Sequence, residues 1–396
     1  MHLTKEEERT LNGEYGETLQ KAIEILVALG DIYGADSLIP IKSAQIAGVS
    51  YKTIGDAGLE WISDLSGKVK VPAILNPAGM DLKRWQDMGV SPKFAKKQHE
   101  IIKAYEKLGV NTKCTCTPYY LEGFTARYGD HLAWSESSAV SYANSVIGAR
   151  TNREGGPSAL SAALIGKTAN YGYHLDENRK PTVSVTVECE LSGSNYGALG
   201  YLVGMTVGNR VPLFFLKNEP CGDELKALGA AMAASGAVAL YHVDKVTPEA
   251  QKTVFEPPDE NIVIEESQIK EVYENRKNAM SCENEIIALG CPHCSSDELA
   301  RIARLLKGKT VKKEMWVCTS REVADSYPHL VSTIEKSGAM VVCDTCMVVS
   351  PASENYKLMM VDSGKALTYV PSMCRLEAKF GSIEDCVKEA GDSNKG

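Results

Sequence analysis

The sequence predicts an α/β protein in which largely parallel sheets are flanked by helices. Short apolar segments typical of strands alternate with helical segments over most of the 396 residues. Their spacing is that of βαβ units, which build parallel sheets. Hydrophobic residues make up 44% of the chain and charged residues 24%, as in an ordinary protein with a large buried core. The length corresponds to about two or three domain-sized units.

The N-terminal part is predicted to open with a helix. Thr4 followed by Glu7 is typical of a capping box, and the apolar stripe that follows ends near Gly30. A loop at 41–50 then leads into a second helix. The next expected elements are the end of that helix at Trp61, a strand at 69–75, a helix at 94–108 and a strand at 110–116.

The remaining elements continue the alternation of strands and helices. Two helices rich in small residues are expected at 137–149 and 158–168. Strands are then expected at 182–190, 211–216, 238–242, 262–264, 285–289, 315–318 and 340–343, with helices at 224–235, 268–276, 296–306 and 321–336. A polar, proline-bearing stretch at 248–258 indicates a domain boundary or an insertion. We therefore expect two regions, 1–245 and 246–396.

Charge and hydropathy argue against several classes of function. The net charge is −8, and no block of five like charges occurs, so we expect neither a nucleic-acid nor a membrane-surface partner. No apolar run approaches the roughly 18 residues of a transmembrane helix. The N-terminus is charged from the start and has no signal-peptide core, so we expect a cytoplasmic protein.

Twelve cysteines are many for a cytoplasmic chain, in which disulfides are rare. The isolated ones are interpreted as packing residues: Cys189, Cys221, Cys282, Cys318 and Cys386. Three pairs each lie at or just beyond the carboxyl end of a predicted strand: Cys114/Cys116, Cys291/Cys294 and Cys343/Cys346. Since ligands bind at the carboxyl ends of parallel strands, three such turns can deliver thiolates to one point.

The three pairs admit several interpretations. A zinc ribbon separates its two Cys-x-x-Cys motifs by about 15–20 residues, whereas a helix, a strand and a helix are expected between Cys294 and Cys343. A thioredoxin-like motif is a second alternative, although two such motifs beside a Cys-x-Cys are unusual. A third is that all six are packing thiols. The pattern favours a shared iron–sulfur site, in which three thiolates leave one iron open as a Lewis acid.

Other segments have residues suited to binding an anion. Gly48 and Ser50 precede a helix whose N–H groups can bind phosphate, although plain capping by Ser50 is the alternative. Lys365 follows a glycine after an apolar run and either meets an anion or is a solvated charge. The loop 148–157 concentrates two arginines and either binds a carboxylate or forms structural ion pairs. Glu136 either complements a helix dipole or is a buried acid–base group.

Eight short segments between residues 47 and 365 occur in a characteristic order. They are Ala47-Gly48-Val49-Ser50-Tyr51, Asn76-Pro77-Ala78-Gly79, Cys116-Thr117-Pro118-Tyr119, Glu136-Ser137-Ser138-Ala139, 148–157, Gly290-Cys291-Pro292-His293, Asp344-Thr345-Cys346 and Ser363-Gly364-Lys365. Each is weak alone, but jointly they are highly specific. Together they resemble the aconitase X family.

The resemblance implies an aconitase-like multi-layer architecture without the swivelling domain. It also implies an iron–sulfur cluster, [4Fe–4S] with one open iron, held by Cys116 from the first region and by Cys291 and Cys346 from the second. It leaves open the roles of Cys114, Cys294 and Cys343. The family occurs as one long chain or as a large subunit with a small swivelling one. This chain ends soon after Lys365 and resembles the large subunit, which implies a heterodimer.

The implied activity is removal of water from (R)-5-phosphomevalonate to give trans-anhydromevalonate 5-phosphate, in an archaeal-type mevalonate route to isoprenoids. The residues expected to bind substrate are Gly48, Val49, Ser50, Asn76, Pro77, Glu136, Ser137 and Lys365. Glu136 and Ser137 are the catalytic candidates on this chain, and the base is expected from the small subunit, as a serine in related aconitases. Dehydration of cis-3-hydroxyproline is the alternative activity, and it would require an appended domain. A non-enzymatic iron–sulfur or zinc regulator is a further alternative, which a basic face would favour.

Overall fold

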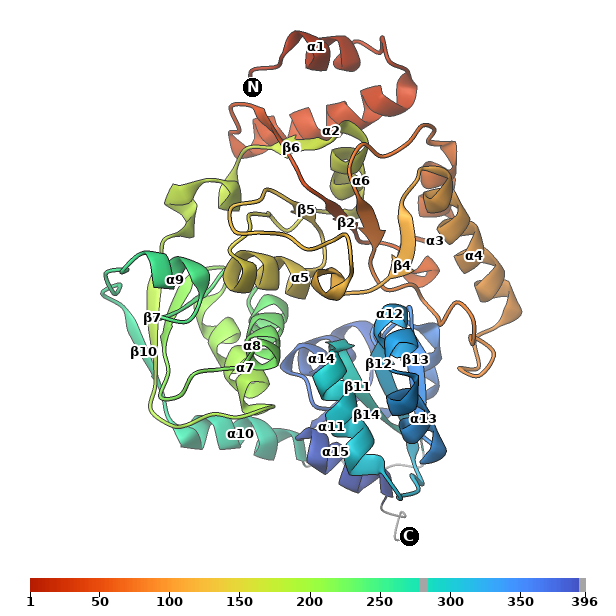
Figure 1. Ribbon diagram of the computed structural model, residues 1–396, viewed down its shortest axis with the longest axis vertical. Helices are drawn as coiled ribbons and strands as arrows, with labels where there is room; N and C mark the ends of the chain where they lie inside the picture. The colour runs from red at the N-terminus through yellow and green to blue at the C-terminus, as the bar shows by residue number, and fades with distance from the viewer. Residues whose placement is uncertain (278–283, 392–396) are drawn as a thin grey trace.

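The computed structural model describes residues 1–277 and 284–391, with the side chains of 275–277 excepted. This part of the chain contains three parallel sheets and one antiparallel strand pair, so the predicted α/β class with parallel sheets and flanking helices is confirmed. The N-terminal helices lie at the top of Figure 1. Cys282, interpreted as a packing residue, lies outside the described residues. No helix in the described ranges is long and apolar enough to cross a bilayer.

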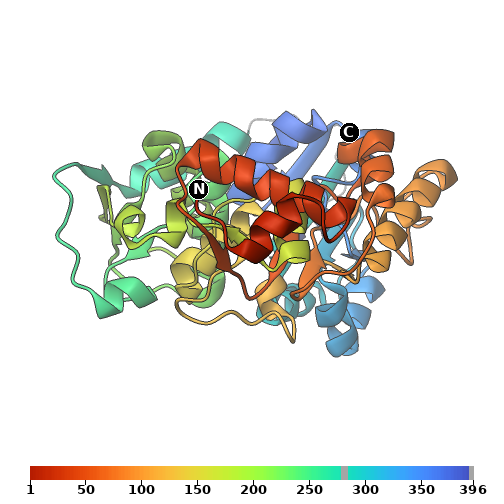
Figure 2. The same cartoon turned by 90° about the horizontal axis from the view of Figure 1, so that it is seen from above.

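The first sheet has the strand order β4-β3-β2-β5, and all its strands are parallel. Its strands are β2 (Ala44–Ile46), β3 (Ala73–Leu75), β4 (Asn111–Cys114) and β5 (Ala133–Trp134). The helices around it are α2 (Glu17–Tyr33), α3 (Tyr51–Asp64), α4 (Pro92–Lys107), α5 (Ser137–Tyr142) and α6 (Gly156–Ile165), with a π-helical turn at Ala143–Ile147. An outer layer holds α1 (Lys5–Leu11) and the antiparallel pair β1 (Leu38–Pro40) and β6 (Lys167–Ala169). Figure 2 shows α1 and α2 in front of the rest of the chain.

The second sheet, at the left of Figure 1, has the order β10-β7-β8-β9 and is also parallel. Its strands are β7 (Val183–Val187), β8 (Pro212–Phe215), β9 (His242–Val243) and β10 (Asn261–Ile264). Its helices are α7 (Asn195–Val207), α8 (Gly222–Ser235), α9 (Pro248–Lys252) and α10 (Glu266–Lys277). Helices α7 and α8 pack closely because α7 carries glycines. A Cβ at Gly200 would lie 2.4 Å from the carbonyl oxygen of Leu228, too close for any other residue without backbone movement.

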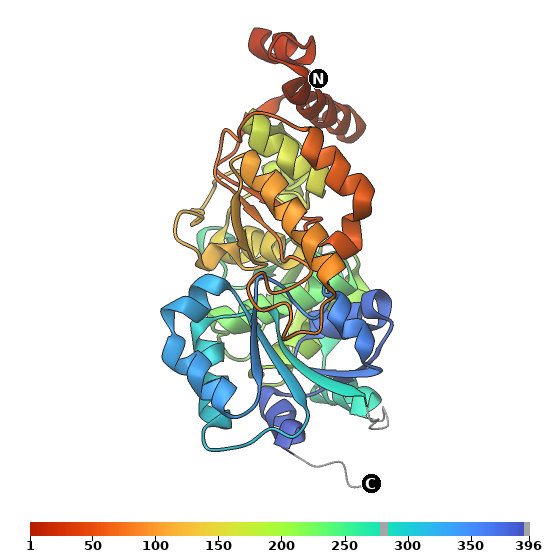
Figure 3. The ribbon, with the colours of Figure 1, turned by 90° about the vertical axis from the view of Figure 1, so that its right-hand side faces the viewer.

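The third sheet, at the lower right of Figure 1, has the order β13-β12-β11-β14-β15, again parallel. Its strands are β11 (Glu285–Cys294), β12 (Glu314–Thr319), β13 (Met340–Cys343), β14 (Leu358–Val361) and β15 (Glu377–Phe380). The helices are α11 (Ser296–Leu306), α12 (Arg321–Ser326), α13 (Pro328–Lys336), α14 (Gly364–Tyr369) and α15 (Ile383–Gly391). Figure 3 shows this unit below the first one, so that the two sheets lie along the long axis of the molecule.

Several predicted elements differ from the observed ones. The helix expected from Thr4 to Gly30 is two helices, because the chain turns at Gly13 and Gly16, both with positive φ. The capping box at Thr4 is present. The loop expected at 41–50 contains strand β2, and the helix expected at 321–336 is divided before Pro328, which cannot continue a helix.

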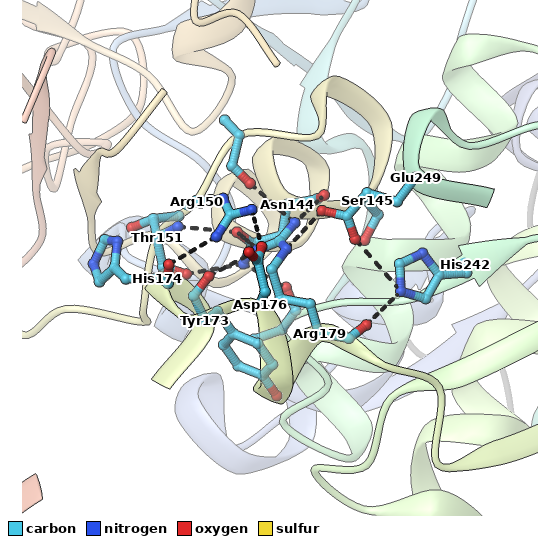
Figure 4. A network of polar contacts seen from close by, with 12 residues as sticks. Asn144, Ser145, Arg150, Thr151, Tyr173, His174, Asp176, Arg179, His242 and Glu249 are labelled. Atoms are coloured by element: carbon cyan, nitrogen blue, oxygen red, sulfur yellow. Dashed lines mark hydrogen bonds and ion pairs between the residues drawn. The ribbon is translucent and has the colours of Figure 1, made fainter. Parts of the chain in front are cut away.

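A buried polar network joins the units of the first and second sheets (Figure 4). The Arg179 guanidinium is 3% exposed and donates to Glu249 at 2.6 Å. Its two terminal nitrogens donate to the side-chain and main-chain oxygens of Asn144 and to the carbonyls of Tyr173 and Ala149, at 3.0–3.3 Å. All five N–H donors of the arginine thus have acceptors. The network fixes the C-terminal end of the helical segment that begins at α5.

The two expected regions, 1–245 and 246–396, stay a prediction. The second sheet takes strands from both sides of residue 245, since β10 pairs with β7 in parallel register.

Candidate active site

A cavity of about 200 Å³ lies between the first and third sheets. Its lining comes from loops at the carboxyl ends of strands in both sheets. The residues that the structure brings together here include Asn76, Pro77, Cys116, Glu136, Ser137, Arg153, Cys291, Cys346 and Lys365. Eight of the expected substrate or metal residues thus meet in one place, and Arg153 lies beside them.

Each strand of the first sheet delivers one part of the lining. Ala47 follows β2, Asn76 follows β3, Cys116 follows β4 and Ser135 follows β5. The chain builds this sheet from β2 outward to β4 and then returns to place β5 on the other side of β2. Such a reversal leaves a crevice at the carboxyl ends of the two strands, where α/β proteins bind ligands. The cavity lies at this crevice.

The third sheet meets the cavity at its own point of reversal. Strands β12 and β13 lie on one side of β11, and β14 and β15 lie on the other. Cys291 follows Leu289, where the regular pairing of β11 with β12 shifts. Cys346 follows β13, and Lys365 lies in the first turn of α14 after β14. Because both sheets are parallel, their carboxyl edges can face one another across a single cavity.

The thiols of Cys116, Cys291 and Cys346 are buried, with residue exposures of 4%, 4% and 8%. None of the three is in a disulfide. Burial raises the pKa of the Cys116 thiol to about 12, with a further contribution from Glu136. Burial also raises the pKa of Cys291 and Cys346. Without a bound cation these groups therefore remain protonated thiols, and any metal that binds them must displace protons.

Lys365 and Glu136 form a buried ion pair at the wall of the cavity, with the Lys365 ammonium donating to Glu136 Oε1. It also donates to Ser138 Oγ at 3.2 Å. Burial alone would raise the pKa of Glu136, but Lys365 together with the hydrogen bonds from Ser138 and Ala139 lowers that pKa from its ordinary value. Burial would lower the pKa of Lys365, and Glu136 raises it instead. Both groups are therefore charged near neutral pH. Ser137 Oγ lies 3.4 Å from Glu136 Oε1.

Gly48, Val49 and Ser50 lie behind the cavity wall, and in the described part of the chain they do not belong to its lining. Ser50 Oγ accepts from Lys52 N at 3.3 Å, capping α3, and donates to the carbonyl of Val349 at 3.0 Å. The Val49 carbonyl accepts from Gln98. Their neighbour Ala47 does line the cavity, and a Cβ on Gly156 would lie 2.4 Å from its carbonyl oxygen. The glycines of loop 148–157 thus permit close packing behind the site.

The other cysteine of each sequence pair is also buried, but within the described residues it does not line this cavity. These are Cys114, Cys294 and Cys343. Cys114 Sγ donates to the Thr112 carbonyl at 3.4 Å. Cys343 lines a different cavity of about 590 Å³. In each sequence pair, therefore, one cysteine faces the central cavity and the other points elsewhere.

Arg153 and Tyr369 also line the cavity. Tyr369 was not expected there, and Arg153 was expected only as one of two arginines in the loop 148–157. Arg153 Nη2 lies 3.4 Å from the Tyr369 hydroxyl. The two arginines of loop 148–157 were the available signal, but the sequence could not tell which of them faces the site. Arg150 instead pairs with Asp176 and donates to the His174 carbonyl at 2.9 Å (Figure 4).

An ion triad holds the loops of the two sheets together beside the cavity. Arg321 donates to Asp81 at 2.6 Å and to Asp344. Asp81 also accepts from Cys343 N at 3.0 Å, and the Asp344 carbonyl accepts from Ala78 N at 2.8 Å. Asp344 is two residues from Cys346, so these contacts fix the loop that carries this thiol.

Comparisons with known proteins agree with the fold. Three consecutive aconitase X models match the chain: the first domain at residues 1–177, the second domain at 181–274 and the third domain at 284–392. The chain belongs to the aconitase X family, which confirms the resemblance. It is also similar to a solved structure, Thermococcus kodakaraensis aconitase X in its holo-form. The TM-score is 0.91 at 48% identity, over 98% of this chain and 100% of the other.

Named relatives are close in sequence and length. The phosphomevalonate dehydratase large subunit of Methanosarcina mazei is 69% identical over 98% of this chain and 97% of its own. The protein of the same name from Methanothermobacter thermautotrophicus is 54% identical over 96% of both chains. The cis-3-hydroxy-L-proline dehydratase of Pseudomonas aeruginosa is more distant: it is 33% identical, and this chain covers 68% of it.

Proposed function

We propose that this chain is the large subunit of a phosphomevalonate dehydratase, a hydro-lyase that removes water from (R)-5-phosphomevalonate to give trans-anhydromevalonate 5-phosphate. The observation that carries the proposal is the meeting of three buried thiols and a buried lysine–glutamate pair at one cavity. The relatives support the substrate. Identity to the archaeal large subunits is 48–69% for four of them, over nearly the whole of both chains.

The donor set fits an iron–sulfur cluster, which the family also suggests. Three thiols are the usual protein ligands of iron in such clusters, and a [4Fe–4S] cluster with three of them keeps one open iron. Among the described residues, no three His, Cys, Asp or Glu side chains are grouped for a single metal ion. This is compatible with a cluster, because each thiolate then binds a separate iron atom. When bound, the cluster supplies a Lewis acid for the substrate hydroxyl.

The chain's own residues would bind and orient the substrate. Phosphomevalonate carries a carboxylate and a phosphate, and Lys365 and Arg153 place two cations on the cavity wall. The Asn76 Oδ1 atom is buried without a hydrogen-bond partner among the described residues, so it has an unmet acceptor for a substrate hydroxyl. Of the segment Gly48–Ser50 we now propose an indirect role, in which Ser50 supports the Val349 loop.

The proton acceptor is expected from a second chain. The lowered pKa of Glu136 makes it a weak base for a proton α to a carboxylate. Relatives named large subunits imply a small partner, and a mobile domain can admit substrate and then exclude water from the site. We propose that a small swivelling subunit covers the cavity as a heterodimer and supplies the base, while Glu136 and Ser137 orient the substrate.

The test is to produce the chain alone and with the candidate small subunit, and to reconstitute the cluster anaerobically in both. Formation of anhydromevalonate phosphate from phosphomevalonate is then assayed, with cis-3-hydroxyproline as the control substrate. We expect turnover of phosphomevalonate in the heterodimer alone. Full activity of the isolated chain would refute the shared site and make Glu136 the first candidate for the base. Turnover of hydroxyproline in its place would refute the substrate.

A further inference from the structure

His293 lies between the three loops that carry the cavity thiols, and the proposed reaction gives it no role. Its side chain is fully buried, and it follows Cys291 by two residues. Its Nε2 lies 2.8 Å from the carbonyl oxygen of Thr345, the residue before Cys346. Its Nδ1 lies 3.0 Å from the hydroxyl of Thr115, the residue before Cys116. One imidazole thus bonds to both of the other thiol-bearing loops.

The contacts continue through the Cys116 loop. Thr115 Oγ1 also accepts from the backbone N–H of Thr117 at 3.1 Å, and the two threonine hydroxyls are 3.1 Å apart. The His293 backbone N–H donates to Cys116 Sγ at 3.1 Å. A carbonyl oxygen only accepts, so Nε2 carries a hydrogen. The bond to Thr115 forms whether Nδ1 accepts from the hydroxyl or donates to it, because a hydroxyl does both.

These bonds hold the spacing of groups that must act together. Three thiolates bind one cluster only if their loops keep a fixed separation, and a displacement of about 1 Å is enough to spoil such a site. We propose that His293 is a positioning residue that holds the Cys116 and Cys346 loops at a fixed distance from Cys291. The purpose of this spacing rests on the proposed function, whereas the spacing itself can be measured in the metal-free chain.

Two substitutions each keep one of the two side-chain hydrogen bonds of His293 and remove the other. The amide of His293→Asn reaches the Nδ1 position and keeps an acceptor for Thr115, while that of His293→Gln reaches the Nε2 position and keeps a donor for Thr345. His293→Leu loses both bonds. In the metal-free full-length chain, alkylation of Cys116 and Cys346 by iodoacetamide is followed peptide by peptide with mass spectrometry. Iron and sulfide are measured separately after anaerobic reconstitution.

We expect His293→Leu to raise the alkylation rates of both cysteines at least about fivefold, from the usual strength of a buried hydrogen bond. His293→Asn should raise the rate for Cys346 alone, and His293→Gln that for Cys116 alone. Thr115→Val, which removes one link from its other end, should match His293→Gln. A general loosening of the fold would raise both rates together, so it cannot produce this opposite pattern, in which one variant affects only Cys346 and the other only Cys116. Equal rises at both cysteines in all variants, or no rise, would overturn the proposal.

His242→Gln is the matched control, since His242 is 1% exposed and its Nε2 bonds to the Arg179 carbonyl at 2.8 Å, in the other polar network (Figure 4). It should leave both alkylation rates unchanged, and a rise equal to that in His293→Leu would overturn the proposal. The iron content distinguishes failure of the positioning role of His293 from failure of the proposed cluster. If the parent chain binds no iron but shows the opposite pattern, the positioning role stands and the cluster fails. If the parent binds iron and His293→Leu binds as much, the positioning role fails and the cluster stands.

Discussion

Two of the buried ion pairs are alike in composition and burial and differ in their surroundings. Arg179–Glu249 joins two units, and all five N–H donors of the arginine bond to protein acceptors. Lys365–Glu136 borders a cavity with three thiols, and its neighbour Asn76 has an acceptor without a partner in the described residues. We call the first pair closed because its arginine has no N–H left for a ligand, and the second open because it faces a space that a ligand can fill.

The difference shows that burial and charge do not by themselves identify a functional group. Both pairs are buried, and both join a basic side chain to a glutamate. What separates them is the cavity: the unmet acceptor of Asn76 borders it and is available to a ligand, whereas the unpartnered Nδ1 of His242 lies in the buried network around Arg179. The same substitutions should therefore reduce stability at one pair and catalysis at the other.

The largest effect is expected for the cavity thiols. Cys116→Ser, Cys291→Ser and Cys346→Ser should each abolish dehydration and lower the iron content, because a site with three ligands has none to spare. Iron analysis and the assay of the heterodimer check this. Cys386→Ser, at a buried thiol packed behind the third sheet, and Cys189→Ser should both stay close to the parent. Unchanged iron in all three cavity variants would remove the thiols from the site.

A large loss of stability is expected at the closed pair. Arg179→Met leaves the Glu249 carboxylate buried without its partner, which costs about 3–5 kcal/mol. Urea denaturation should show this loss, whereas the iron content of the folded protein at low temperature should match the parent. Lys245→Ala, at an exposed pair with Asp244, is the control and should cost at most about 1 kcal/mol. Loss of iron from folded Arg179→Met would contradict this expectation and show that the Arg179–Glu249 pair also supports the thiol site.

A smaller effect, on catalysis, is expected at the open pair. Lys365→Ala removes a charged hydrogen bond to the substrate and should lower kcat/KM for phosphomevalonate by about 1.5–3 kcal/mol. Steady-state kinetics on the reconstituted heterodimer measure it. Kinetics equal to those of the parent would remove Lys365 from the site.

Arg153→Gln should act in the same direction at the lower end of that range, about 1.5 kcal/mol, because this arginine is more exposed to solvent. The loss should diminish at high salt, which screens an exposed charge more than a buried one. Arg150→Gln is the matched control from the same loop, since Arg150 bonds to Asp176 and to the His174 carbonyl. A greater kinetic loss in the control would reverse the assignment.

The smallest effect is expected from pH. Glu136 has a pKa lowered below 4.5 in the folded chain, so its contribution to stability is present above that value and is lost as pH falls through the folded pKa. Between pH 5 and 8, roughly, kcat/KM of the parent should therefore show no ionisation of Glu136. In Lys365→Ala, burial is opposed only by the hydrogen bonds from Ser138 and Ala139, so the pKa of Glu136 should rise and a new acidic limb should appear in the profile. A limb of that kind in the parent would contradict the charged pair.

Much of the site could be predicted from the sequence because its residues lie in short motifs after strands. Strand ends are marked locally by apolar runs, and parallel topology then brings them together, as for Cys116, Asn76 and Lys365. The direction in which a loop residue points is set by contacts with residues far away in the sequence, and local sequence patterns do not predict such contacts. Ser50, for example, caps α3 and bonds to Val349, 299 residues away, and its expected contact with the substrate stays a prediction. His293 is a second case, because its partners come from the loops that follow β4 and β13.

The breaks in the predicted helices have a similar origin. Gly13, Gly16 and Pro328 end helices that the apolar periodicity alone continues through. Strand β9 has only two residues where five were expected, since the apolar residues at 238–241 are buried without ladder partners in the described sheet. Burial and strand pairing are separate properties, and hydropathy reports only the first.

Spectroscopy of the chain purified without oxygen tests the central claim most directly. Ultraviolet–visible absorption, electron paramagnetic resonance and iron and sulfide analysis are measured on the parent and on Cys116→Ser. A brown parent protein with iron and sulfide in cluster proportions, and a variant that loses both, is the predicted result. A colourless parent that contains zinc and retains its metal in Cys116→Ser would contradict it.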